Sequence, residues 1–159
     1  MGAASRDIDA RAPRGWRLGG GVTYGSLAAA RLGLHVRAVV GLDDEAAATA
    51  PELDLLRSAG VELELVRLVR GPVFDNQQTP GGRVQLVHQV SDALPVDAVP
   101  DDWRRSPAVM LVPVAGELSD DWAALPAPGA FVGLAWQGLF RRLIVGRPVE
   151  RVLLRPGPL

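Results

Sequence analysis

Three adjacent glycines, Gly19 to Gly21, open a helix-forming stretch near the start of the chain, in the segment RLGGGVTYGSLAAARLG. Glycine clusters that open a helix often face a phosphate, a nucleotide or a sugar. Glycine lets such a ligand come close to the backbone N–H groups at the positive end of the helix. The cluster is therefore the first candidate for a binding site.

Three interpretations of this cluster compete. A dinucleotide-binding fingerprint requires a hydrophobic strand before the glycines, but RAPRGWRL precedes them, and Gly19, Gly21 and Gly25 do not fit the G-x-G-x-x-G spacing. A Walker-type phosphate loop requires a lysine, and all 17 basic side chains of this protein are arginines. The third interpretation is a flexible turn before a core helix, which the cluster alone leaves open.

Missing residue types narrow the chemistry further. Without lysine the chain has no Schiff-base mechanism, and without cysteine it has no disulfide, no thiolate zinc site and no cysteine nucleophile. His35 and His88 lie too far apart in the sequence to suit a metal site, so we expect both to be structural or exposed.

The charge balance and the lack of long apolar segments predict the location of the protein and the classes of partner that it lacks. A formal net charge of −1 argues against a general nucleic-acid binder, which would carry a basic surface. The segment MGAASRDIDARAPRG lacks the apolar core of a secretory signal, and no apolar run approaches membrane-spanning length. We therefore expect a cytoplasmic protein with neither nucleic acid nor membrane as its partner.

Local patterns predict the elements that surround the glycine cluster. An alanine- and leucine-rich helix is expected over 22–32, ended by Gly33, and a buried strand over 36–40, stopped by Gly41. The acidic run at 43–45 suits the entrance of a helix.

A second helix and a strand should follow directly. Thr49 and Glu52 have the spacing of a capping box, with Pro51 in the first turn, which predicts a helix over 50–59. VELELVRLV alternates from Val61 onward and predicts a half-exposed strand.

The segment PVFDNQQTPGGRVQLVHQ predicts a β-hairpin. Two strand-like runs, 73–77 and 83–90, flank TPGG, which offers both proline and glycine for the turn. Alternation predicts one apolar face that needs a cover, made of Val73, Phe74, Val84, Leu86 and Val90.

The second half of the chain completes an α/β pattern. AVMLVPV, residues 108–114, is a continuous apolar run and predicts a strand covered on both faces. Ser119 can cap a helix that carries Trp122, and a further buried strand should begin at Ala130. Alternating strands and helices favour a parallel core sheet with flanking helices and the hairpin as an antiparallel insert, in one domain or part of a larger one.

The order of these segments resembles the ribokinase-like carbohydrate kinases of the phosphofructokinase-B type. That family has an early Gly-x-x-x-x-Asp segment, matched here by GAASRD with Gly2 and Asp7, and then a Gly-Gly segment, matched by GGGVTYG. VAGEL and WQGLFRRL, farther along the chain, look like the segments in which the family's central strands end.

The resemblance covers only the N-terminal portion of the family. The late Gly-Ala-Gly-Asp motif that supplies the base and the anion hole in the family is absent. Residues 1–159 are accordingly expected to form a partial ribokinase-like domain, with a lid hairpin at about 61–90, the C-terminal half absent and no catalytic residue or metal ligand. ATP and magnesium are expected for the complete enzyme and should bind poorly to this chain, and the lid hairpin is expected to permit a homodimer.

The resemblance also assigns candidate substrate-binding residues for a sugar or polyol. Asp7 would accept hydrogen bonds from hydroxyls, Asn76 would donate and accept, Glu117 would stand near the end of a central strand, and two glycines, Gly20 and Gly21, would let the backbone approach the ligand. Five charged residues are expected to be merely solvated: Asp9, Asp43, Asp44, Arg141 and Arg142.

The leading hypothesis is thus the sugar-facing part of an ATP-dependent kinase that phosphorylates a hydroxyl of a sugar, polyol or nucleoside, inactive as this fragment. The main alternative is a non-catalytic ligand-binding or interaction domain derived from the same fold. A dinucleotide-binding domain is the third possibility.

Overall fold

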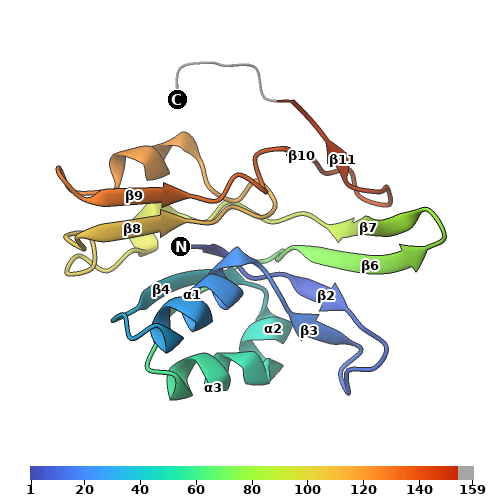
Figure 1. Ribbon diagram of the computed structural model, residues 1–159, viewed down its shortest axis with the longest axis horizontal. Helices are drawn as coiled ribbons and strands as arrows, with labels where there is room; N and C mark the ends of the chain where they lie inside the picture. Colours follow the sequence, from blue (N-terminus) through green and yellow to red (C-terminus); the bar gives the residue numbers. More distant parts are fainter. Residues whose placement is uncertain (154–159) are drawn as a thin grey trace.

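The computed structural model describes residues 1–153 (Figure 1). Short 3-10 helices cover Val96–Ala98 and Asp120–Ala124. The remaining elements, in chain order, are β1 (Gly2–Ala3), β2 (Arg6–Ile8), β3 (Trp16–Leu18), α1 (Gly21–Arg31), β4 (Arg37–Leu42), α2 (Asp44–Thr49), α3 (Pro51–Ser58), β5 (Glu62–Arg67), β6 (Val73–Thr79), β7 (Gly82–Gln89), β8 (Ala108–Leu111), β9 (Phe131–Leu134), β10 (Arg141–Arg142) and β11 (Glu150–Arg151).

A parallel sheet forms the centre of the molecule. β4 pairs in parallel with β1 on one side and with β5 on the other, and β8 pairs in parallel with β9. The Met1 amino group donates to Met110 O at 2.8 Å and Val112 N donates to Met1 O at 2.9 Å, which joins β8 to the chain just before β1. The strands therefore follow the spatial order β9-β8-β1-β4-β5, and the predicted parallel core is confirmed.

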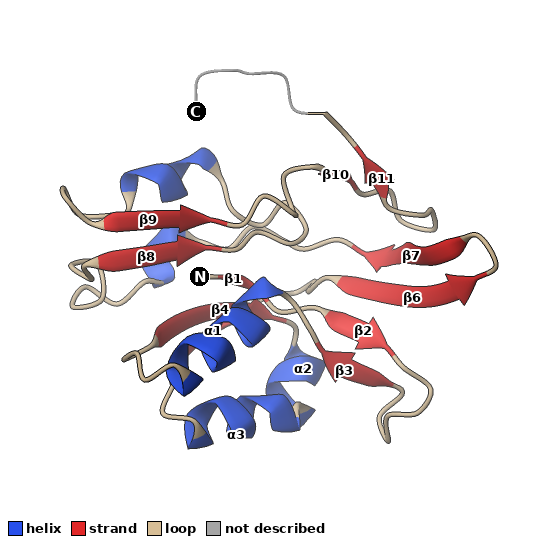
Figure 2. Ribbon diagram, viewed as in Figure 1, coloured by secondary structure: helices blue, strands red, loops and turns tan. Residues whose placement is uncertain are grey.

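Apolar side chains cover both faces of the middle of this sheet. The helices α1, α2 and α3 lie together on one face (Figure 2), where Val40 and Leu42 pack against Leu53 and Leu56. Val39 points the opposite way, into a second cluster with Leu94, Val99, Trp103, Val109, Leu111 and Trp122. Alternation along β4 thus divides its side chains between two cores.

A second sheet of four strands, in the order β3-β2-β6-β7, extends from the carboxyl ends of the parallel strands (Figure 1). The chain enters this sheet directly after β1. The next strand, β2, pairs in parallel with β6 and antiparallel with β3. The β6–β7 hairpin turns tightly between Thr79 and Gly82, as TPGG predicts. The hairpin begins at Val73 and not near residue 61, because β5 belongs to the parallel sheet.

The hairpin does not have the single apolar face that alternation predicted. An irregularity between Val73 and Phe74 shifts the register, so that Phe74 lies opposite Val87, and both side chains are buried against Val114 and Ala115. Val84 and Leu86, three and one residues before Val87, pair with Gln77 and Asp75. Since Phe74 is covered within its own chain, it does not need a partner subunit, and the hairpin homodimer stays a prediction.

Helix boundaries depend on contacts that the local pattern does not contain. Gly33 ends α1 with a φ of +83°, as predicted, whereas Gly41 lies inside β4 and does not stop it. Thr49 is the last residue of α2, and its hydroxyl donates to Glu45 O at 2.8 Å. Ala50 therefore occupies the N-cap of α3, and the predicted capping box does not form.

The second half follows the expected order with shorter elements. The strand expected over 108–114 ends at Leu111, and Met110 on its outer face is 52% exposed, so β8 is not covered on both sides. The helix after Ser119 is a single stretch of 3-10 helix that buries Trp122. Within residues 1–153, no helix has the length and apolarity needed to cross a membrane, and the cytoplasmic location stays a prediction.

Candidate functional site

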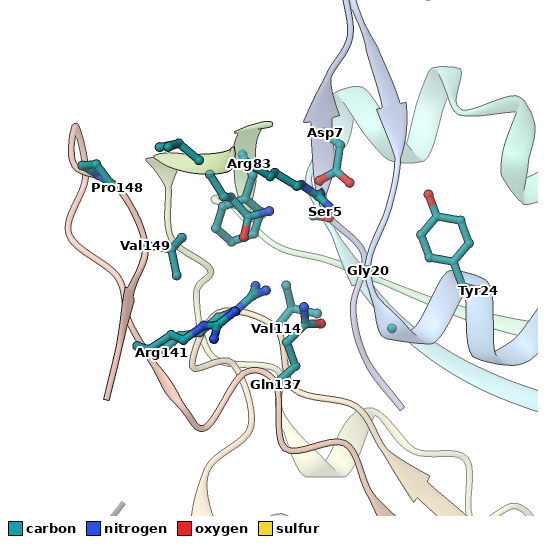
Figure 3. Close-up of a pocket in the computed structure, with 15 residues that line it drawn as sticks. Ser5, Asp7, Gly20, Tyr24, Arg83, Val114, Gln137, Arg141, Pro148 and Val149 are labelled. Carbon is teal, nitrogen blue, oxygen red and sulfur yellow. Dashed lines mark hydrogen bonds between the residues drawn. The ribbon is translucent and has the colours of Figure 1, made fainter. Parts of the chain in front are cut away.

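A cavity of about 570 Å³ lies where the carboxyl ends of the parallel strands meet the four-stranded sheet. Ligands of open α/β folds collect at this edge, because loops from several strands converge there. The loops after β1, β8 and β9 form one part of the wall, the start of α1 a second, the β6–β7 hairpin a third and the β10–β11 segment a fourth (Figure 3). The lining residues are Ser5, Asp7, Gly20, Gly21, Tyr24, Phe74, Arg83, Val84, Gln85, Val114, Gln137, Arg141, Pro148, Val149 and Arg151.

Asp7 is the one carboxylate among these lining residues. Its Oδ1 accepts a hydrogen bond from Ser5 Oγ at 2.9 Å. A Cβ atom on Gly19 would collide with Asp7 Oδ2, so glycine at this position lets the carboxylate lie against the backbone. Burial raises the pKa of Asp7, opposed by the Ser5 hydrogen bond and by the charges of Arg83 and Arg141. A partly desolvated carboxylate that faces a cavity is suited to accept hydrogen bonds from ligand hydroxyls.

The predicted glycines lie at the cavity and also have a packing role. Gly20 is the N-cap of α1 with a φ of +92°, and a Cβ there would lie 2.7 Å from Ala3 O. A Cβ on Gly21 would lie 3.1 Å from Val112 Cβ. The glycines therefore allow the start of α1 to pack directly on the parallel sheet, with its first backbone N–H groups beside the cavity.

Asn76 lies behind the cavity wall and not in it. Its Oδ1 accepts hydrogen bonds from Arg83 Nη2 and from Gln85 Nε2, both at 2.8 Å. Those two side chains line the cavity, so Asn76 positions residues that can meet a ligand. The predicted direct contact between Asn76 and the substrate does not fit this location.

Glu117 is fully buried and takes no part in the cavity lining. Its carboxylate accepts backbone hydrogen bonds from Ala3 N at 2.9 Å, from Val114 N at 2.9 and 3.1 Å, and from Ala115 N at 2.7 Å. It thereby ties the end of β1 to the loop after β8. The expectation that Glu117 contacts substrate is corrected by these contacts, which leave the carboxylate no free face.

Three arginines at the cavity were not predicted from the sequence. Arg83 comes from β7, Arg141 from β10 and Arg151 from β11. Arg141 was expected to be solvated, but burial lowers its pKa, as do the positive charges of Arg83 and Arg151, while Asp7 acts in the opposite direction. Its neighbour Arg142 is exposed and pairs with Glu150, as expected of a surface charge.

The other charged residues expected to be solvated divide into two groups. Asp43 is buried, accepts from Ala46 N at 2.9 Å and pairs with Arg6 at 2.9 Å, so that expectation was wrong. Asp44 is exposed and pairs with Arg67. Asp9 pairs with Arg11 and Arg17, and the hydrogen bonds from Arg11 lower the pKa of Asp9 to about 2.

The cavity does not have the side chains of a metal site. Among residues 1–153 there is no group of three or more His, Cys, Asp or Glu side chains that could hold a metal ion. The cavity lining pairs one carboxylate with three guanidinium groups, a set that favours anions over cations. The described residues therefore do not fit the magnesium expected for the complete enzyme.

Several solved structures share this fold. One is a pyrophosphate-dependent kinase in the ribokinase family complexed with a pyrophosphate analog and myo-inositol, with a TM-score of 0.73 and 20% identity over 94% of this chain and 52% of that one. Another is a pyrophosphate-dependent myo-inositol-1 kinase converted into a myo-inositol-3 kinase by substitution, with a TM-score of 0.71 and 19% identity over 94% of this chain and 51% of that one.

A sulfate complex of a pyrophosphate-dependent ribokinase-family kinase also matches, with a TM-score of 0.69 and 19% identity over 94% of this chain and 53% of that one. No protein-family profile and no curated protein sequence matches the chain. The chain spans about half the length of the solved structures that it matches. Its fold is ribokinase-like, as expected, and it corresponds to part of that fold.

Proposed function

We propose that this chain is the substrate-binding part of a carbohydrate kinase of the phosphofructokinase-B type, which phosphorylates a hydroxyl of a sugar, polyol or nucleoside. The observation that carries the proposal is the position of Asp7, a partly buried carboxylate in a cavity of about 570 Å³ at the carboxyl ends of the parallel strands. The likeness to a kinase structure that contains myo-inositol supports a polyol as the ligand class.

The residues of this chain bind and orient the acceptor. Asp7 accepts hydrogen bonds from one or two ligand hydroxyls, held in place by Ser5 and by the close approach of Gly19. The first N–H groups of α1 offer donors beside it. The β6–β7 hairpin covers the ligand with Phe74, Gln85 and Arg83, and so keeps water from the reacting hydroxyl.

Phosphoryl transfer needs further groups. The complete enzyme is proposed to use ATP with magnesium, although the matching kinases are described as pyrophosphate-dependent, so both donors belong in an assay. The residues at the cavity provide no metal site and no second carboxylate to act as a base. We therefore expect no turnover by this chain with either donor, and measurable transfer absent from a mock preparation would contradict the assignment of roles.

Calorimetric titration of the chain with a panel of neutral polyols and nucleosides tests the substrate site. Asp7→Asn should weaken the tightest ligand by about 1.5–3 kcal/mol, the range for a hydrogen bond to a charged group. Asp9→Asn, next to the same strand but paired with Arg11 and Arg17, should leave affinity unchanged. Equal effects of the two substitutions would remove the reason for assigning Asp7 to the substrate.

The alternative function, a non-catalytic ligand-binding domain, shares this cavity and differs in chemistry. Fusion of the chain to the C-terminal half of a matching kinase would separate the two functions. Transfer by the fusion that disappears with Asp7→Asn favours the kinase, whereas binding without transfer favours the binding domain. Saturable binding of NAD would favour the third possibility, a dinucleotide-binding domain.

A further inference from the structure

Three guanidinium groups converge on the cavity from separate strands. Arg83 projects from the lid hairpin, and Arg141 and Arg151 project from the two paired strands β10 and β11, where Arg141 lies opposite Arg151. Figure 3 shows the Arg83 and Arg141 side chains directed into the cavity. The charges are close enough for Arg83 and Arg151 to lower the pKa of Arg141.

These arginines lack the carboxylate partners that most other arginines among residues 1–153 have. Arg141 and Arg151 have neither an ion pair nor a side-chain hydrogen bond with any residue among 1–153, and Arg83 has only the neutral Asn76. Asp7 is the sole opposing charge at the cavity lining, which leaves an excess of two positive charges. Arg141 is partly buried, whereas Arg83 and Arg151 are exposed at the edge of the cavity. The like charges of these two residues repel the charge of Arg141, and a bound anion relieves that repulsion.

We propose that the substrate of this site is an anionic polyol, a sugar or cyclitol that carries a carboxylate or a phosphate group. The inference rests on the proposed function and specifies its substrate class. The hydroxyls lie toward Asp7 and Ser5, and the anionic group lies between Arg83, Arg141 and Arg151. A volume of about 570 Å³ accommodates a ligand of this size.

The choice of arginine agrees with this division of the cavity. A guanidinium group presents a planar fork of N–H donors that matches carboxylate and phosphate oxygens and stays charged at any physiological pH. A neutral ligand would leave the excess of two positive charges uncompensated. The anionic group therefore contributes binding energy that a neutral polyol of the same shape cannot supply.

Binding of matched ligand pairs tests this proposal on the unmodified chain. The pairs are D-glucitol and D-gluconate, ribitol and ribitol 5-phosphate, and myo-inositol and myo-inositol 1-phosphate, titrated calorimetrically at fixed ionic strength. At least one anionic member should bind about tenfold or more tightly than its neutral partner. The gluconate and phosphate arms distinguish a carboxylate from a phosphate as the preferred group.

Two neighbouring substitutions locate the anion. Arg141→Gln should remove the preference for the anionic member, whereas Arg142→Gln, whose side chain pairs with Glu150, should keep the preference. Arg151→Gln is a second variant at the same site, for use if Arg141→Gln alters the circular dichroism of the fold.

Each outcome decides between the two proposals. If neutral polyols bind through Asp7 and anionic members bind no better, the anionic substrate is overturned while the proposed function stands. If no polyol of either kind binds, the proposed function fails. If pyrophosphate alone binds as tightly as the anionic polyols and with the same dependence on Arg141, the arginines hold a phosphoryl donor and the anionic substrate is overturned.

Discussion

Most charged side chains beside the helices are paired with an opposite charge within the chain, whereas the arginines around the cavity are not. Near the helices, Asp43 pairs with Arg6 and caps α2, and Glu52 pairs with Arg14 at 2.9 Å and accepts from Leu18 N. At the cavity, burial raises the pKa of Asp7, and the arginines repel one another. The first arrangement stabilises the fold, and the second leaves interactions available for a ligand.

The largest effect should come from the apolar core on the helix side. Leu56→Ala on α3 removes a fully buried side chain and should lower the free energy of unfolding by about 2–5 kcal/mol. Leu55→Ala, the same change at the adjacent and 46% exposed residue, should cost less than about 1 kcal/mol. Urea denaturation of both variants measures the difference, and equal losses would show that stability does not reside in this core.

The next effect concerns the floor of the cavity, where backbone and sheet are in close contact. Gly20→Ala forces a Cβ to within 2.7 Å of Ala3 O at a φ of +92°, and should cost about 2–3 kcal/mol. Gly33→Ala also places alanine at positive φ, but with no atom within 4 Å, and should cost about 1 kcal/mol. If thermal unfolding shows equal costs, the packing of α1 on β1 is looser than the structure indicates.

A smaller difference in stability is expected between substitutions of two adjacent carboxylates on the helix side. Asp43→Ala removes a helix cap and a half-buried ion pair with Arg6, and should cost about 1–2 kcal/mol. Asp44→Ala removes only the exposed pair with Arg67 and should cost less than about 1 kcal/mol. Denaturant midpoints compare the two variants, and a larger loss for Asp44 would contradict the view that paired burial gives Asp43 its importance.

The same contrast explains how far the sequence predicts the structure. Local patterns predict α1 with its terminal Gly33 and the TPGG hairpin, because each depends on residues close in the chain. The placement of Asp7 with Gly20 and Gly21 at one site was expected from the family resemblance. The capping box fails because Arg14 and Leu18 N, 38 and 34 residues away, hold Glu52 instead.

The missed parts of the cavity depend on long-range pairing. The two-residue strands β10 and β11 have no local signal, and only their pairing places Arg141 and Arg151 opposite Arg83. Glu117 ends beside backbone N–H groups of two different strands, which no spacing in the sequence reveals. Alternation along β7 does place Arg83 on the face of Val87, and the register across the hairpin turn was the signal that could have identified it.

The smallest expected effect is on the pH dependence of stability. It has opposite signs for Asp7 at the cavity and for Asp92, which pairs with Arg70. Because burial raises the pKa of Asp7 in the folded chain, the folded state binds that proton more tightly than the unfolded state does. The ionised carboxylate therefore destabilises the fold as pH rises above the ordinary aspartate range. Asp7→Asn should make the unliganded chain slightly more stable at pH 7, and the gain should fade as the pH falls below that range.

Asp92 provides the reversed case. Hydrogen bonds from Arg70 lower its pKa, so its ionised form stabilises the fold above the ordinary aspartate range, and this contribution is lost as pH falls through the lowered value. Asp92→Asn should destabilise the chain at pH 7 and converge with the parent chain in acid. Melting temperatures between pH 3 and pH 8 (roughly spanning ordinary aspartate titration) compare the variants. If Asp7→Asn destabilises the chain at neutral pH as Asp92→Asn does, Asp7 is a structural carboxylate. Its ionised form then stabilises the fold, and the trade of stability for ligand binding does not apply to it.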